Sequence, residues 1–78
     1  MTASDEDYVA LGRALAALRR RAGLTQAQAG EVAGVGNTHI SSVELGNRGL
    51  SYGTMLALLR AYGVGLRELA EMIERGEG

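Results

Sequence analysis

The chain has 78 residues with 8 Lys or Arg against 9 Asp or Glu, and its formal net charge at pH 7 is −1. It contains no Cys, Pro, Trp or Phe and a single His, which excludes disulfides, thiolate metal sites and His-based metal or catalytic clusters. We therefore predict a protein that is not an enzyme and that holds no metal and no cofactor. The length fits one small domain over residues 1–78, with a core at about 5–74.

Neither a membrane span nor a secretory signal is visible in the sequence. No apolar run approaches the roughly 20 residues that cross a bilayer. The chain begins MTASDEDY, which is acidic, whereas a signal peptide begins with basic and then apolar residues. We expect a cytoplasmic protein without a membrane partner.

The charges fall into three blocks along the chain. Residues 1–7 carry three acidic side chains and no basic one, and residues 61–78 carry four Glu against two Arg. Residues 8–60 carry six Arg against two Glu, a net charge of +4. Every basic residue is Arg, whose planar guanidinium suits phosphate and guanine. A basic centre between acidic ends is compatible with nucleic-acid contact, which the net charge alone disfavours.

Five helices are predicted, and the first spans about 5–22. Apolar residues with helical spacing define its inward face: Tyr8, Leu11, Leu15 and Leu18. Ser4 followed by Asp7 fits an N-cap signal, and Gly23 is expected to end the helix as a left-handed cap.

The second helix is predicted over 25–33, where Thr25 and Gln28 have the spacing of a capping box. Small residues form its inward face: Ala29, Gly30, Val32 and Ala33. A glycine in mid-helix costs about 1 kcal/mol relative to alanine. We therefore expect the backbone of another helix to approach Gly30.

The third helix is predicted over 37–45, after a glycine turn, and Gly46 should end it. Apolar residues are expected to make its buried contacts: Ile40 and Val43, with Leu45 as a third. As an N-cap, Gly36 is less favourable than Ser or Thr by only about a few tenths of a kcal/mol. Asn37 is an alternative N-cap. An Asn37 side chain that caps the helix is not free to make other contacts.

The fourth helix is predicted over 51–62, with Ser51 as its N-cap, and the fifth over 66–74. An apolar stripe marks the inward face of the fourth: Met55, Leu58, Leu59 and Tyr62. Apolar residues also mark the inward face of the fifth: Leu66, Leu69, Ala70 and Ile73. Met72, and part of Leu69 or Ile73, are expected to lie outside the core and to be available for contact with a partner.

The two short helices joined by a glycine turn outline a helix-turn-helix at 25–45, a motif whose second helix lies in the DNA major groove. The predicted fold class is all-α, a compact five-helix domain. The alternative is an ordinary helical bundle in which the Gly-Val-Gly turn is only a loop.

Three segments carry a resemblance to a known family: LGRALAALRRRAGLTQ at 11–26, AGVGNTHISSVELGNR at 33–48 and LSYGTMLALLRAYGV at 50–64. They resemble the lambda-repressor-like helix-turn-helix proteins, also called the Cro-type or xenobiotic-response-element family, over about residues 8–73. The size and the segment around 44–51 look similar to controller proteins of restriction–modification systems. Small phage repressors and antitoxins are the alternatives within this family. The resemblance implies a lambda-repressor-like fold and binding to double-stranded DNA.

The resemblance also implies roles for individual residues. Positions that read bases in related repressors are occupied here by Asn37, Thr38 and Ser42, with His39 alongside. Positions that contact DNA phosphates are occupied by Gln26, Asn47 and Arg48. Arg19 and Glu44 match a partly buried salt bridge between the first and third helices. Asn pairs bidentately with adenine, and Thr can touch a thymine methyl.

The predicted function is a sequence-specific transcription regulator, associated with the nucleoid, that binds a palindromic operator as a homodimer. The dimer would place two recognition helices about 34–36 Å apart, one turn of DNA. The candidate dimer interface on the fifth helix is Leu69, Met72 and Ile73, and no sensor domain is expected. The alternative is a protein-interaction module, such as an antitoxin or accessory subunit with a protein partner, which the net charge favours.

Overall fold

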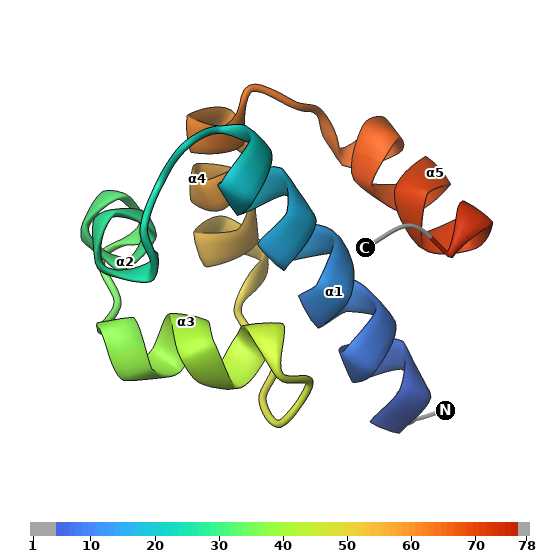
Figure 1. The fold of residues 1–78 in the computed structure, drawn as a ribbon, viewed down its shortest axis with the longest axis horizontal. Coiled ribbons are helices and arrows are strands. Elements are labelled where there is room, and N and C mark those ends of the chain that lie inside the picture. The colour runs from blue at the N-terminus through green and yellow to red at the C-terminus, as the bar shows by residue number, and fades with distance from the viewer. Residues whose placement is uncertain (1–4, 77–78) are drawn as a thin grey trace.

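The structure, a computed structural model, describes residues 5–76 and consists there of helices and their connections (Figure 1). The helices in this range are α1 (Asp5–Arg21), α2 (Gln26–Ala33), α3 (Asn37–Glu44), α4 (Tyr52–Tyr62) and α5 (Leu66–Arg75). Each helix end lies within one residue of its predicted position, and the all-α class is confirmed. Ser4, predicted as the cap of the first helix, lies outside the described residues.

Helix α1 lies at the centre of the arrangement. It contacts α3, α4 and α5, while α2 packs against both α3 and α4. Helix α5 lies on the opposite side of α1 from α2 and α3 (Figure 1). Helix α1 therefore lies between the pair α2–α3 and α5 (Figure 1).

The core is mainly aliphatic, with Tyr62 as its aromatic member, and is built mainly from α1, α3 and α4. Its most deeply buried side chains are Leu15, Leu18, Val43, Leu58 and Leu59. Ile40 and Val43 bury one face of α3, as predicted, and so direct its other face outward. Within residues 5–76, no helix is long and apolar enough to span a membrane.

Side-chain caps fix where α2 and α4 begin. Thr25 Oγ1 accepts a hydrogen bond from the Gln28 N–H at 3.1 Å, and Gln28 Oε1 accepts one from the Thr25 N–H at 2.9 Å. The predicted capping box is thus confirmed. Ser51 Oγ accepts from the Thr54 N–H at 3.1 Å, which confirms the predicted cap of α4. Each cap satisfies an amide that has no partner within its helix.

Two helical glycines permit close contact between backbones. A Cβ on Gly30 would lie 2.6 Å from the carbonyl oxygen of Val35. The close backbone is therefore the turn that follows α2, and the prediction that another helix approaches there is wrong. A Cβ on Gly12 of α1 would lie 2.7 Å from the carbonyl oxygen of Glu44, so α1 crosses the end of α3 at Gly12. No close contact was predicted at Gly12.

Two apolar residues of α2 and α3 were predicted to face inward and are exposed instead. Val32 is 54% exposed, because the buried strip of α2 is narrow and consists of Ala29 and Gly30. Leu45 is 68% exposed, because it caps the end of α3 just before the chain turns away at Gly46, where φ is +80°. The prediction that Val32 and Leu45 contribute to the core is therefore wrong.

Helix α5 buries only part of its predicted face: the prediction is confirmed for Leu69 and wrong for Leu66 and Ala70. Leu69 and Met72 are buried in the core, whereas Leu66 and Ala70 are exposed and Ile73 is half-buried. Helix α5 packs on α1, and the side that it turns toward α1 and the core carries Leu69 and Met72. The prediction that Met72 and part of Leu69 are left over for a partner is therefore wrong.

We predict that Gly30→Ala lowers the free energy of unfolding by about 1–3 kcal/mol, because the added methyl group meets backbone that cannot move aside. Helix propensity alone would favour alanine by about 1 kcal/mol. Gly53→Ala in α4 is the matched control, since a Cβ there has no neighbouring atom within 4 Å. Urea denaturation should show Gly53→Ala unchanged or more stable, and equal effects of the two substitutions would contradict the close approach at Gly30.

Candidate nucleic-acid interface

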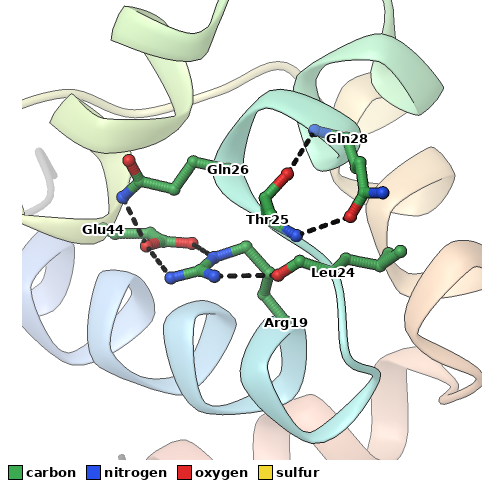
Figure 2. A network of polar contacts seen from close by, with 6 residues as sticks. All are labelled: Arg19, Leu24, Thr25, Gln26, Gln28 and Glu44. Atoms are coloured by element: carbon green, nitrogen blue, oxygen red, sulfur yellow. Dashed lines mark hydrogen bonds and ion pairs between the residues drawn. The ribbon is translucent and has the colours of Figure 1, made fainter.

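Glu44, the last residue of α3, receives hydrogen bonds from two other helices (Figure 2). Arg19 of α1 donates from Nε to Glu44 Oε2 at 2.7 Å and from Nη2 to Oε1 at 3.1 Å. Gln26 of α2 donates from Nε2 to Glu44 Oε1 at 2.9 Å. Arg19 Nη1 also donates to the Leu24 carbonyl oxygen at 2.9 Å. The implied Arg19–Glu44 salt bridge is therefore present, and it joins α1, α2 and α3 at one point.

The Arg19–Glu44 pair is well shielded from water, with side chains that are 11% and 7% exposed. The hydrogen bond to Glu44 raises the pKa of Arg19, with burial opposing it. Burial, with the negative charge of Glu44, raises the pKa of the nearby Tyr62 to about 12. Tyr62 is neutral near pH 7 with or without this shift, so the ion pair lies against an uncharged side chain of the core.

The N-terminus of α2 has free donors at its surface. The capping box occupies the amides of Thr25 and Gln28, while the amides of Gln26 and Ala27 have no acceptor within the helix. The first turn of α2 holds no acidic residue, so the helix dipole there favours an anion. The Gln26 side chain is held by Glu44 through one amide hydrogen, which leaves its second amide hydrogen for another acceptor.

The outward face of α3 is polar and carries no charged side chain near its start. Asn37 and Thr38 are exposed, and Ser42 is half-buried one turn later. The N-cap of α3 is Gly36, and no side chain caps this helix. The Asn37 amide is therefore not used as a cap, which resolves the alternative left open by the sequence.

The connection after α3 exposes Asn47 and Arg48. Arg48 forms no ion pair with any carboxylate among residues 5–76. Its guanidinium is thus available to an outside anion. Asp5 of α1 lines the same open groove as Arg48, so one acidic residue lies beside this loop.

His39 is placed differently from the other predicted readout residues. It is half-buried, and its Nε2 lies 3.4 Å from the carbonyl oxygen of Gly49. The ring is therefore turned toward the loop after α3, whereas Asn37 and Thr38 face solvent. The sequence pattern gives no signal for this contact, because Gly49 lies ten residues away and carries no side chain.

Two groups of exposed charges lie on different helices. Arg20 and Arg21 are exposed at the end of α1, which leads into α2. Three exposed glutamates lie on α5, on the other side of α1: Glu68, Glu71 and Glu74. Among the described residues, no group of three or more His, Cys, Asp or Glu is close enough to hold a metal ion.

Comparisons with known proteins match this arrangement. A family model described as a helix-turn-helix domain matches residues 10–72. The solved structure of the restriction-modification controller protein C.AhdI from Aeromonas hydrophila is similar, with 32% identity, a TM-score of 0.77, and coverage of 83% of this chain and 94% of that chain. No curated protein sequence matches the chain significantly.

A second restriction-modification controller protein, C.Esp1396I, shares the fold. Its wild-type structure is 19% identical, with a TM-score of 0.78 and coverage of 88% of this chain and 91% of that chain. A point mutant of the same controller is also 19% identical, with a TM-score of 0.79 and coverage of 96% and 92%. At this identity the likeness concerns the fold alone.

We predict that Glu44→Gln lowers the free energy of unfolding by about 3 kcal/mol, because it leaves the shielded Arg19 guanidinium without a counter-charge. Glu71→Gln is the matched control, since Glu71 faces Arg75 at 3.6 Å in an exposed i,i+4 pair. Exposed pairs of this kind contribute about 0.5 kcal/mol or less. Urea denaturation at neutral pH measures both variants, and a Glu44→Gln loss no larger than that of Glu71→Gln would contradict the anchoring role.

Proposed function

The chain belongs to the helix-turn-helix domain family of DNA-binding regulators, and we propose that it binds a palindromic operator as a homodimer, with α3 in the major groove. The observation that carries the proposal is the orientation of α3. Ile40 and Val43 bury one face, and the other face offers Asn37 and Thr38 to solvent. In this motif the start of the second helix contacts base edges.

Base readout is assigned to Asn37, Thr38 and Ser42. The Asn37 amide, which is not engaged as a cap, can pair with the N6 and N7 atoms of adenine. Thr38 and Ser42 follow on the same helix and offer hydroxyl groups, which donate or accept hydrogen bonds at base edges.

Phosphate contacts are assigned to the two segments that flank the end of α3. One is the start of α2, where Gln26 and two backbone amides can bind an anion. The other is the loop with Asn47 and the unpaired Arg48. Phosphate contacts fix the register of a protein on DNA but carry no sequence information. Phosphate contacts at these two segments, both near one end of α3, would therefore orient the other end of the helix in the major groove.

The length of α3 favours a dimer. Its eight residues extend over about 12 Å, which covers only a few base pairs. A two-fold dimer doubles the site and places its helices about 34–36 Å apart. The described part of the protomer measures 30 Å along its longest axis, which is of the same order as this spacing.

The proposed dimer surface remains on α5 but shifts to its exposed side. Ile73 is the one interface candidate that keeps partial exposure, because Leu69 and Met72 are buried. Leu66, Ala70 and Ile73 follow the spacing i, i+4 and i+7 and so share one face. An apolar stripe of this kind on an otherwise charged helix suits a second copy of the same helix.

We predict that the protein binds a fragment from its own upstream region with sequence preference and with affinity that falls steeply with salt. Asn37→Ala should cost about 1–3 kcal/mol and relax preference at one base position. Arg48→Ala should weaken binding to all DNA sequences about equally. It should also reduce the slope of log affinity against log salt concentration by about 1. Arg67→Ala on α5 is the control and should change neither quantity. Titrations of labelled DNA fragments measure these effects. If the affinity for the upstream fragment at low salt is no higher than the affinity for non-specific DNA, the proposal is wrong.

We predict that the protein is a dimer at micromolar concentration or when bound to DNA. Leu66→Asp should shift it toward monomer, because a charge in an apolar interface is costly to bury. Val32→Asp, which places the same charge on the exposed face of α2, is the control and should leave the mass unchanged. Sedimentation equilibrium reads out the mass, and a strict monomer both free and on DNA would refute the dimer.

A further inference from the structure

The loop after α3 carries its two exposed residues between two glycines that lie directly on α1. A Cβ on Gly46 would lie 2.7 Å from Val9 Cγ2, and a Cβ on Gly49 would lie 2.8 Å from Tyr8 Cε1. The loop backbone therefore touches two consecutive residues of α1. Asn47 and Arg48, between the glycines, point into solvent.

The two ends of this loop are held by different means. The first end is joined to α3 by backbone hydrogen bonds, from the Gly46 N–H to Val43 O at 3.0 Å and from the Asn47 N–H to Ser42 O at 2.9 Å. The second end, at Gly49, is contacted by side chains. The Tyr8 ring lies against it, and the His39 ring nitrogen lies 3.4 Å from its carbonyl oxygen.

The Tyr8 ring is not a core side chain. It is 36% exposed and lies outside the cluster of buried residues, although the sequence placed it in the inward stripe of the first helix. Together with Val9 it forms one side of an open groove of about 540 Å³, whose other side is the loop 46–49. The Tyr8 ring therefore contacts the loop at Gly49 and does not pack in the core.

We propose that Tyr8 and His39 are positioning residues for DNA binding, which hold Gly49 from two sides and so fix Arg48 in the conformation that meets the phosphate backbone. This inference rests on the proposed phosphate contact of that loop. A loop that is already ordered in the free protein loses less conformational entropy on binding than a mobile loop does, and so binds more tightly. Ordering a single residue on binding corresponds to about 5- to 30-fold in affinity.

The holding contact is tested first in the free, full-length protein. Tyr8→Ala and His39→Ala should each lower the ¹⁵N heteronuclear NOE of the Arg48 and Gly49 amides, which reports motion on the picosecond-to-nanosecond scale. Tyr8→Phe keeps the ring carbons that contact Gly49 and should restore the wild-type value. Tyr52→Ala removes another exposed ring and is the control. Unchanged values in both Tyr8→Ala and His39→Ala would overturn the inference.

The use of the contact is tested by DNA affinity at a temperature where urea titration shows every variant folded. Tyr8→Ala should weaken binding by about 5- to 30-fold, and Tyr8→Phe should not. In an Arg48→Ala background the further loss from Tyr8→Ala should largely vanish, because the ring acts through Arg48. Independent, multiplicative losses would indicate a merely structural role and would overturn the inference.

The two proposals fail in distinguishable ways. If Arg48→Ala weakens DNA binding but neither Tyr8→Ala nor His39→Ala does, the inference fails and the proposed function stands. If the wild-type protein binds DNA without sequence preference, the proposed function fails, and the proposed role of Tyr8 and His39 in DNA binding fails as well. The NMR result on the free protein then still decides whether these side chains hold the loop.

Discussion

The placement of α3 depends on the carboxylate of Glu44. This one group accepts hydrogen bonds from Arg19 on α1 and from Gln26 at the start of α2, while it belongs to the last residue of α3. Gly12 lets the backbone of α1 lie directly on the same end of α3. The end of α3 is therefore fixed by charge-assisted hydrogen bonds and by close backbone packing together, whereas its start extends away from these contacts.

A helix fixed at one end and exposed at the other suits a DNA-binding regulator. The anchored end brings the start of α2 and the Asn47–Arg48 loop to the same neighbourhood, so the proposed phosphate contacts lie close to the anchor. The glutamates of α5 lie on the other side of α1 and are kept away from this face (Figure 1). Because three of the glutamates lie on α5 and Glu44 is neutralised by Arg19, a chain with a net charge of −1 can still present a surface suited to DNA.

The sequence predicted the helices well because their signals are local. The apolar periodicity, the capping box at Thr25 and the terminating glycines all act within a few residues of one another. The Arg19–Glu44 pair was identified through family resemblance alone, since its partners are 25 residues apart. Leu45 and Met72 were misassigned because the exposure of an apolar side chain depends on which neighbouring element covers it. Helical spacing alone does not carry that information.

An NMR titration of the ¹⁵N-labelled protein with an operator duplex, and with a scrambled duplex of equal length, shows directly which residues contact DNA. We predict that the largest operator-specific amide shifts fall on residues 37–42, with shifts at 26–27 and 47–48 common to both duplexes. Shifts that centre instead on the acidic face of α5, or that are the same for both duplexes at every residue, would contradict the claim that α3 reads the DNA.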